Sequence, residues 1–97
     1  MELKDKIIVV TGAASGIGRA MALRFAQEGA KKVVCADINH QGAEETSSSI
    51  NGLSVKVNVG KENEIKALID RVEDEIGPID LFCSNAGISV AGGVDVD

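Results

Sequence analysis

A glycine-rich stretch near the start of the chain has the residue types and spacing of a phosphate-binding turn. Residues 11–18 read Thr-Gly-Ala-Ala-Ser-Gly-Ile-Gly, between an apolar run at residues 7–10 and a segment with helical spacing of apolar side chains. Backbone N–H groups at a helix N-terminus bind anions, and the helix dipole adds about half a positive charge there. Glycine is needed because a Cβ would hold a pyrophosphate away from the backbone. The stretch therefore predicts a cradle for a nucleotide diphosphate.

An acidic residue, Asp37, ends the next apolar run at residues 33–36 and lies 19 residues after Gly18. This is close to the spacing at which a carboxylate accepts hydrogen bonds from an adenosine ribose. NADP would bring a further phosphate near this carboxylate, and each like-charge pair at about 4 Å costs on the order of 4 kcal/mol at an effective dielectric of about 20. No Arg or Lys occupies residues 13–15 or 38–39 to offset that repulsion. We therefore predict NAD as the cofactor, the alternative being that Asp37 is a plain turn residue.

The glycine stretch has two other interpretations. It could be a tight strand-to-helix turn whose glycines serve only packing, and that alternative stays open. A nucleotide triphosphatase loop is excluded, because such a loop ends in Gly-Lys followed by Ser or Thr, whereas Gly18 is followed by Arg19 and Ala20.

The spacing T-G-x-x-x-G-x-G resembles that of the short-chain dehydrogenase/reductase family. Residues 84–87, Ser-Asn-Ala-Gly, are similar to the family segment N-N-A-G, and residues 58–59, Asn-Val, stand where the family usually has Asp-Val. The matches span residues 11–87, nearly the whole chain. They are specific to the family and not to a substrate.

The resemblance implies a set of residues that contact NAD. Taken from the N-terminus onward, these residues would contact first the pyrophosphate, then the adenosine ribose, then the adenine edge and last the nicotinamide-side ribose. The residues expected to form this site are Gly12, Ser15, Gly16, Ile17, Gly18, Asp37, Asn58, Val59, Asn85, Ala86 and Gly87.

Two residues depart from the family pattern. Asn58 replaces an aspartate that accepts a hydrogen bond from the adenine amino group in the family; its amide oxygen can still accept, without the assistance of a charge. Ser84 replaces an asparagine that ties neighbouring strands together, and serine has fewer donors and a shorter reach. Neither change removes the pyrophosphate site.

Catalytic residues of the family find no match in this sequence. The family moves a proton with a tyrosine assisted by the lysine of Y-x-x-x-K, and this chain has no tyrosine. We expect the amino-terminal portion of an oxidoreductase that transfers hydride between NAD(H) and an alcohol or carbonyl substrate, inactive by itself. The complete enzyme is expected to be a homo-oligomer. The alternatives are a short nucleotide-binding or regulatory module, a chain complemented by another, and a structural protein without affinity for NAD.

Composition limits the class of protein. The 97 residues are enough for one small domain, residues 1–97, and 44% of them are hydrophobic, as in globular proteins. A formal net charge of −5 argues against nucleic-acid binding, which needs a basic face. No apolar run is long enough to span a bilayer, and the charged N-terminus does not resemble a secretory signal. These features predict a cytoplasmic protein.

Both cysteines, Cys35 and Cys83, fall in predicted buried strands. If the strand order is 3-2-1-4, they flank the first strand and lie roughly 10 Å apart, too far for a disulfide. We predict two free thiols in the core. No metal site is expected, because His40 is far along the chain from both cysteines and no C-x-x-C occurs.

Alternation of apolar runs and helical patterns predicts an α/β fold: a Rossmann-like parallel sheet in the order 3-2-1-4 with helices on both faces, incomplete relative to the family. At the switch point between the first and fourth strands, a crevice would bring residues 12–18 and 85–87 onto one ligand. The edge of the fourth strand is expected to be unpaired, and residues 88–97 to be loop or a short strand. Strands are expected at residues 6–11, 32–37, 53–59 and 80–84, and helices at residues 16–28, 40–50 and 62–76.

Overall fold

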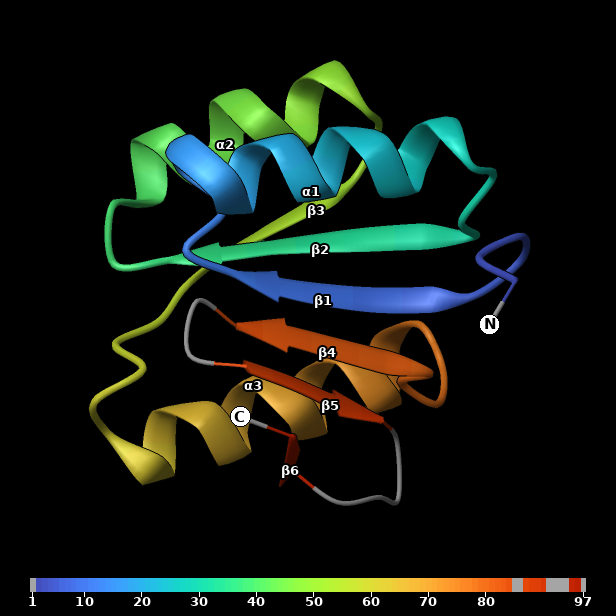
Figure 1. Cartoon of the computed structure of the whole chain (residues 1–97). Coiled ribbons are helices and arrows are strands. Elements are labelled where there is room, and N and C mark those ends of the chain that lie inside the picture. Colours follow the sequence, from blue (N-terminus) through green and yellow to red (C-terminus); the bar gives the residue numbers. More distant parts are fainter. Residues whose placement is uncertain (1, 85–86, 91–94, 97) are drawn as a thin grey trace.

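The computed structural model describes residues 2–84, 87–90 and 95–96, which form one sheet covered by helices (Figure 1). The strands are β1 (Ile7–Thr11), β2 (Lys32–Asp37), β3 (Leu53–Lys56), β4 (Leu81–Ser84), β5 (Gly87–Val90) and β6 (Asp95–Val96). The helices are α1 (Gly16–Gln27), α2 (His40–Ser49) and α3 (Glu62–Glu75).

The strand order is β3-β2-β1-β4-β5-β6. β1 pairs in parallel with β2 on one side and with β4 on the other, and β2 pairs in parallel with β3. This confirms the predicted order 3-2-1-4 for the first four strands. The chain leaves β1 toward one edge and returns to place β4 on its other side, which creates the switch point at which ligands bind in such sheets.

Two expectations about the strands are wrong. The edge of β4 is not open, because β5 pairs with it in antiparallel fashion, from Leu81 opposite Val90 to Ser84 opposite Gly87. An antiparallel neighbour needs only a tight turn, whereas a parallel one needs a long crossover. The third strand ends at Lys56 and not at residue 59, because its partner β2 ends at Asp37, opposite Lys56. The chain then turns at Asn58, whose side-chain oxygen accepts from the Gly60 N–H at 2.9 Å.

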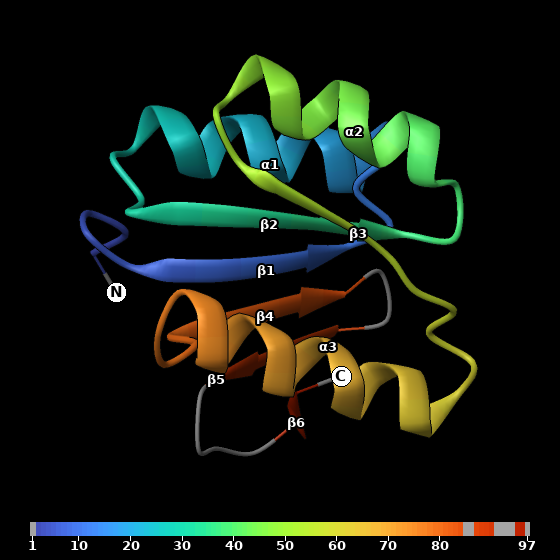
Figure 2. The same cartoon turned by 180° about the vertical axis from the view of Figure 1, so that it is seen from behind.

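Two hydrophobic clusters cover opposite faces of the sheet, because successive strand residues point to opposite sides. The cluster between the sheet and α3 consists of Ile7, Val9, Val34, Ala36, Val55, Val57 and Ile79, together with Leu68 and Val72 of α3 itself. The cluster between the sheet and the helices α1 and α2 consists of Ile8, Val10, Ala13, Val33, Cys35, Leu81 and Cys83, together with Ala22 of α1 and Ala43 of α2. Figure 2, seen from behind, shows α3 lying in front of β4 and β5.

The helix α2 forms although its residues have poor intrinsic helix propensity. Its polar side chains are bonded to backbone carbonyls: Ser47 to Glu44 at 3.1 Å and Ser49 to Thr46 at 2.7 Å. Its N-cap, Asn39, accepts from the Gly42 N–H at 3.1 Å. Tertiary packing and capping therefore outweigh propensity, and the predicted helix is confirmed.

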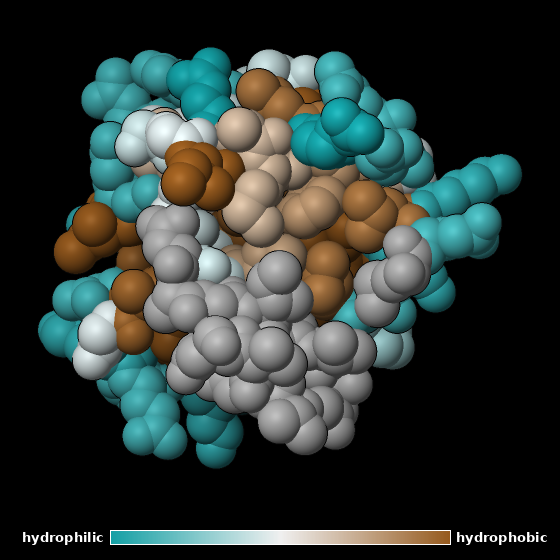
Figure 3. All heavy atoms as spheres, in the orientation of Figure 1, coloured by the Kyte–Doolittle hydropathy of each residue, from teal (hydrophilic) through white to brown (hydrophobic). Residues whose placement is uncertain are grey.

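Apolar side chains also gather at the surface between α1 and the strands beside it (Figure 3). Partly buried residues of α1, Met21, Phe25 and Ala26, pack there against the cluster beneath them. No helix among the described residues is long and apolar enough to cross a membrane.

Cys35 and Cys83 are free, fully buried thiols, as predicted. Both are register partners of Val10, one on each side of β1, so about two strand spacings of ~4.8 Å separate them. Burial raises the pKa of each thiol from 9.0 to about 11, because the charged thiolate is poorly solvated in the core.

These thiols should make the protein less stable in alkali. The unfolded chain loses its thiol protons from about pH 9 upward, whereas the folded chain holds them to about pH 11. The two protonated thiols should therefore contribute fully to the free energy of unfolding below pH 9, and this contribution should be lost as the pH rises toward 11. Urea unfolding at a series of pH values measures this loss. A variant with Cys35→Ala and Cys83→Ala corrects for lysine titration, and parallel pH curves for the two proteins would contradict the prediction.

Candidate functional site

The glycine-rich turn joins β1 to α1 at the carboxyl edge of the sheet (Figure 1). Gly12 and Gly16 have φ values of 69° and 59°, in the region that favours glycine. Ser15 is the N-cap of α1, in extended conformation, and its side chain makes no capping hydrogen bond. The turn therefore presents backbone at the start of a helix without a side chain closing it.

Gly18 and Gly16 are glycines for different physical reasons. A Cβ on Gly18 would lie 2.0 Å from the Gly12 carbonyl oxygen, so Gly18 lets the helix pack against the turn. A Cβ on Gly16 would meet nothing within 4 Å. The turn is thus tightly packed beneath and open above, which is the form that a diphosphate cradle requires. Packing explains Gly18, and the positive φ explains why position 16 is a glycine; the open space at Gly16 is what leaves room for a ligand.

The N-terminus of α1 supplies donors for an anion. The first N–H groups of an α-helix have no acceptor within the helix, and Arg19 N–H, bonded to the Ser15 carbonyl at 3.3 Å, is the first in α1 to have one. Within the part of the chain that the structure describes, the N–H groups of Gly16, Ile17 and Gly18 have no hydrogen-bond acceptor and are available to a ligand. Together with the open space above Gly16, they fit the pyrophosphate of a dinucleotide.

Asp37 ends β2 beside the glycine-rich turn, and two backbone bonds fix its carboxylate. Oδ2 accepts from the Ala14 N–H at 3.0 Å, and Oδ1 accepts from the Asn39 N–H at 2.9 Å. A carboxylate offers about four lone-pair sites. Roughly half therefore stay available for ribose hydroxyls. The bond to Ala14 N–H ties the end of β2 directly to the glycine-rich turn, and the contact of Asp37 with a ribose stays a prediction.

Three large apolar side chains are exposed in the described part of the chain: Ile17, Ile38 and Val59, with exposed fractions of 76%, 60% and 57%. They follow β1, β2 and β3, respectively, so all lie toward the same carboxyl edge of the sheet. Such side chains suit a flat apolar ligand such as a nucleobase. Ile38 was not among the residues predicted for the site, although its place directly after Asp37 was a usable signal.

Asn58 lies at this edge with part of its hydrogen-bonding capacity used. The side-chain oxygen of Asn58 accepts from the Gly60 N–H, and the backbone N–H of Asn58 donates to Glu64 Oε1 at 2.9 Å. The amide oxygen has a second lone pair that can accept from a ligand. The structure thus holds Asn58 rigidly, and its contact with adenine stays a prediction.

The last predicted segment is only partly described. Asn85 and Ala86 lie outside the described residues. Gly87 begins β5 opposite Ser84, so its backbone is at the carboxyl end of β4, next to β1. Its contact with the nicotinamide-side ribose stays a prediction.

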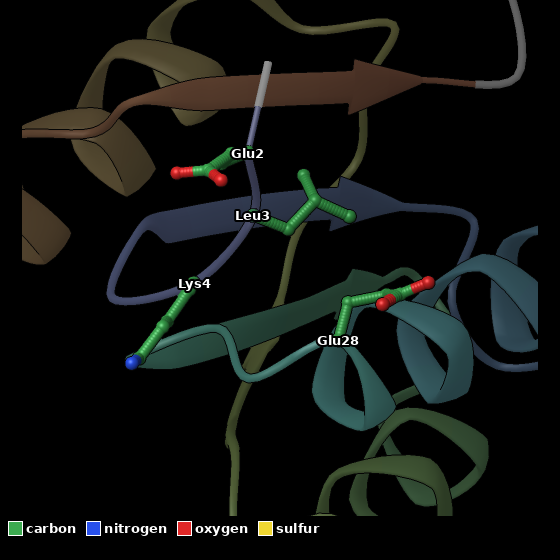
Figure 4. Close-up of a pocket in the computed structure, with 4 residues that line it drawn as sticks. All are labelled: Glu2, Leu3, Lys4 and Glu28. Atoms are coloured by element: carbon green, nitrogen blue, oxygen red, sulfur yellow. The ribbon is translucent and has the colours of Figure 1, made fainter.

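Other polar features do not belong to this site. A hollow of about 310 Å³ is lined by Glu2, Leu3, Lys4 and Glu28, before β1 and after α1, away from the glycine-rich turn (Figure 4). His40 is half exposed and pairs with Glu44 at 3.1 Å. Within the described ranges, no three His, Cys, Asp or Glu side chains are grouped so that they could hold a metal ion.

Comparison with known proteins identifies the family. The family model described as short chain dehydrogenase matches residues 6–96. This chain therefore belongs to the short-chain dehydrogenase/reductase family, as its motifs predict.

Individual relatives agree with this assignment. The chain is 45% identical over 96 residues to the uncharacterized oxidoreductase YxbG of Bacillus subtilis (strain 168), covering 94% of this chain and 35% of the relative. A short chain dehydrogenase/reductase from Burkholderia phymatum in complex with NAD is 30% identical with a TM-score of 0.80, covering 84% of this chain and 31% of the other. A 3-ketoacyl-(acyl-carrier-protein) reductase from Brucella melitensis complexed with NADH is 36% identical with a TM-score of 0.77, covering 82% and 34%. The chain thus spans about a third of the length of the relatives that it matches.

Proposed function

We propose that this chain is the NAD-binding half of an oxidoreductase that transfers hydride between NAD(H) and an alcohol or carbonyl substrate. The complete enzyme would act on a small molecule in the cytoplasm, as a homo-oligomer. In this proposal Gly12, Ser15 and residues 16–18 hold the pyrophosphate, and Asp37 accepts from the adenosine ribose. Asn58 and Val59 meet the adenine, and residues 85–87 support the nicotinamide-side ribose.

The observation that carries the proposal is the position of Asp37. Its carboxylate is held by Ala14 N–H of the turn at 3.0 Å, so the proposed ribose acceptor and the proposed pyrophosphate cradle are joined by one hydrogen bond. An ionised acceptor gives a hydrogen bond of about 1.5–3 kcal/mol. The same charge repels the further phosphate of NADP. This arrangement supports NAD as the cofactor.

The chemistry of hydride transfer belongs to the cofactor, and the contribution of this chain is to bind and orient it. A general base must lie within hydrogen-bond reach of the reacting proton. The sequence has no tyrosine, and its one histidine, His40, begins α2 on the adenosine side. We infer that these 97 residues alone show no turnover.

The first test is Gly16→Ala. Its methyl group would enter the open space that the pyrophosphate is proposed to occupy, and NAD affinity should fall at least about 30-fold, or ~2 kcal/mol. Isothermal titration of the natural protein that carries this chain with NAD measures the loss. The strain of alanine at positive φ costs about 1–2 kcal/mol of stability, so folding is monitored in parallel.

Gly29→Ala is the matched control. Gly29 also has a positive φ, 89°, and its added Cβ would touch Lys4 Cγ at an ordinary 3.6 Å. It follows α1 at the end away from the turn, so this variant should carry similar strain and bind NAD normally. Equal NAD affinities for the two variants would reject the proposed cradle.

A further inference from the structure

The structure holds one peptide group of the glycine-rich turn from both sides. The carbonyl oxygen of Ala13 accepts from Thr46 Oγ1 at 2.8 Å, and the N–H of Ala14 donates to Asp37 Oδ2 at 3.0 Å. These two groups belong to the same peptide bond, which is planar and rotates as a unit. The Thr46 hydroxyl therefore restricts the orientation of the N–H that fixes the Asp37 carboxylate.

Thr46 is placed for this contact by its burial. It lies in the middle of α2 with no exposed surface, where threonine has a poor helix propensity. Its hydroxyl also approaches the Gly42 carbonyl of its own helix at 3.2 Å. The shorter contact is with Ala13, 33 residues away along the chain, so the hydroxyl connects α2 to the turn.

A second contact from α2 reaches the same peptide group. A Cβ on Gly42 would lie 2.7 Å from Ala14 Cβ and 3.3 Å from Ala14 Cα. The first turn of α2 thus packs directly against Ala14. Both the hydroxyl of Thr46 and the absence of a side chain at Gly42 set the position of the Ala13–Ala14 peptide.

We propose that Thr46 is a positioning residue for cofactor selectivity: through the Ala13–Ala14 peptide it holds the Asp37 carboxylate in the orientation that accepts from the ribose of NAD and repels the further phosphate of NADP. The inference rests on the proposed function. Loss of the hydroxyl allows this peptide to rotate, so that the bond from Asn39 N–H to Oδ1 is the remaining bond that fixes the Asp37 carboxylate, and Asp37 gains orientations turned away from the ribose. NAD binding weakens while repulsion of NADP relaxes.

The test is Thr46→Val, which keeps the branched shape and removes the hydroxyl. In titrations of the natural protein with NAD and with NADP, NAD affinity should fall about tenfold, equivalent to one hydrogen bond. NADP affinity should stay the same or rise, so the ratio of the two affinities falls. Thr46→Ser keeps the hydroxyl and should restore the ratio. A role limited to stability would lower both affinities equally, so an unchanged ratio overturns the inference.

Ser47→Ala is the matched control. Ser47 is also buried in α2, and its hydroxyl donates to Glu44 within the helix at 3.1 Å. This variant loses a buried helix hydroxyl without touching the turn, and it should leave the affinity ratio unchanged. A ratio that falls as far in Ser47→Ala as in Thr46→Val would overturn a specific role for Thr46.

Two further measurements make the inference decisive. Amide hydrogen exchange at Ala14, measured without cofactor, should accelerate in Thr46→Val and not in Ser47→Ala; no acceleration overturns the proposed contact. If Thr46→Val does not fold, Gly42→Ala displaces the same peptide by pushing against Cβ and Cα of Ala14 and should lower the same ratio. Absence of NAD binding by the unaltered protein would overturn the proposed function, whereas binding with an unchanged ratio overturns only the role of Thr46.

Discussion

Replacing Gly18 by alanine should collapse the glycine-rich turn and remove NAD binding. The new Cβ would lie 2.0 Å from the oxygen and 2.6 Å from the carbon of the Gly12 carbonyl. Both are backbone atoms that cannot rotate away, so either the turn or the start of α1 must move. Alanine gains about 1 kcal/mol of helix propensity over glycine, but overpacking a rigid site costs about 1–3 kcal/mol and sometimes more. The cost of the clash therefore exceeds the gain in helix propensity, and the substitution destabilises the fold.

Urea unfolding and NAD titration of the same preparations measure the two effects. We expect Gly18→Ala to lose about 3 kcal/mol of unfolding free energy and at least about 100-fold in NAD affinity. Gly16→Ala separates these effects, because its Cβ meets no protein atom: it should lose affinity at a smaller cost in stability. A Gly18→Ala protein with native stability and affinity would contradict the close packing of Gly18 on Gly12.

The contrast between these glycines shows what a sequence pattern can establish. T-G-x-x-x-G-x-G predicted the turn, the start of α1 at Gly16 and the family, because only a few backbone paths join a buried strand to a helix through glycines. The pattern does not distinguish a glycine that packs from one that leaves room for a ligand. That distinction depends on how closely a Cβ at position 18 would approach the Gly12 carbonyl oxygen, which is known only from the folded structure.

Periodicity predicted the helices well where the apolar spacing was strong. The repeat of apolar residues from Ile65 to Ile76 predicted α3, and the structure fully buries two of its members, Leu68 and Val72. Termination of β3 was predicted less well, because it depends on where the partner strand β2 ends, at Asp37 opposite Lys56, rather than on the apolar run. The pairing of β5 with β4 was missed, since strand partners across a turn depend on the return path of the chain.

The candidate site was predictable in its outline and not in its supports. Asp37 was identified by its place after an apolar run. Its bond to Ala14 and the role of Thr46 were not, because these contacts join residues 23 and 33 positions apart. Thr46 stood out only as a poor helix former within a predicted helix, a feature that signals burial or a tertiary bond once the helix is known to form.

Asp37→Asn should reverse the cofactor preference. The substitution keeps the shape of the side chain and one acceptor oxygen but removes the charge. Loss of charge-assisted bonds to the ribose should weaken NAD binding by about 1.5–3 kcal/mol, roughly 10- to 100-fold. The repulsion between this carboxylate and the further phosphate of NADP disappears at the same time. Because that repulsion is on the order of 4 kcal/mol per charge pair at ~4 Å, NADP affinity should rise at least about tenfold. Titration with both nucleotides measures the change in the ratio.

A matched control for this change is Asp80→Asn, which removes the same charge from the opposite end of the sheet. Asp80 Oδ2 also accepts from a backbone N–H, that of Ile7, at 2.8 Å, and the amide oxygen of asparagine can replace it. Because Asp80 precedes β4 and Asp37 ends β2, a general effect of net charge on nucleotide binding would appear in both variants. A local effect appears only in Asp37→Asn. If both variants shift the ratio equally, or neither does, Asp37 does not select the cofactor, and the discrimination between NAD and NADP must come from residues beyond this edge of the sheet.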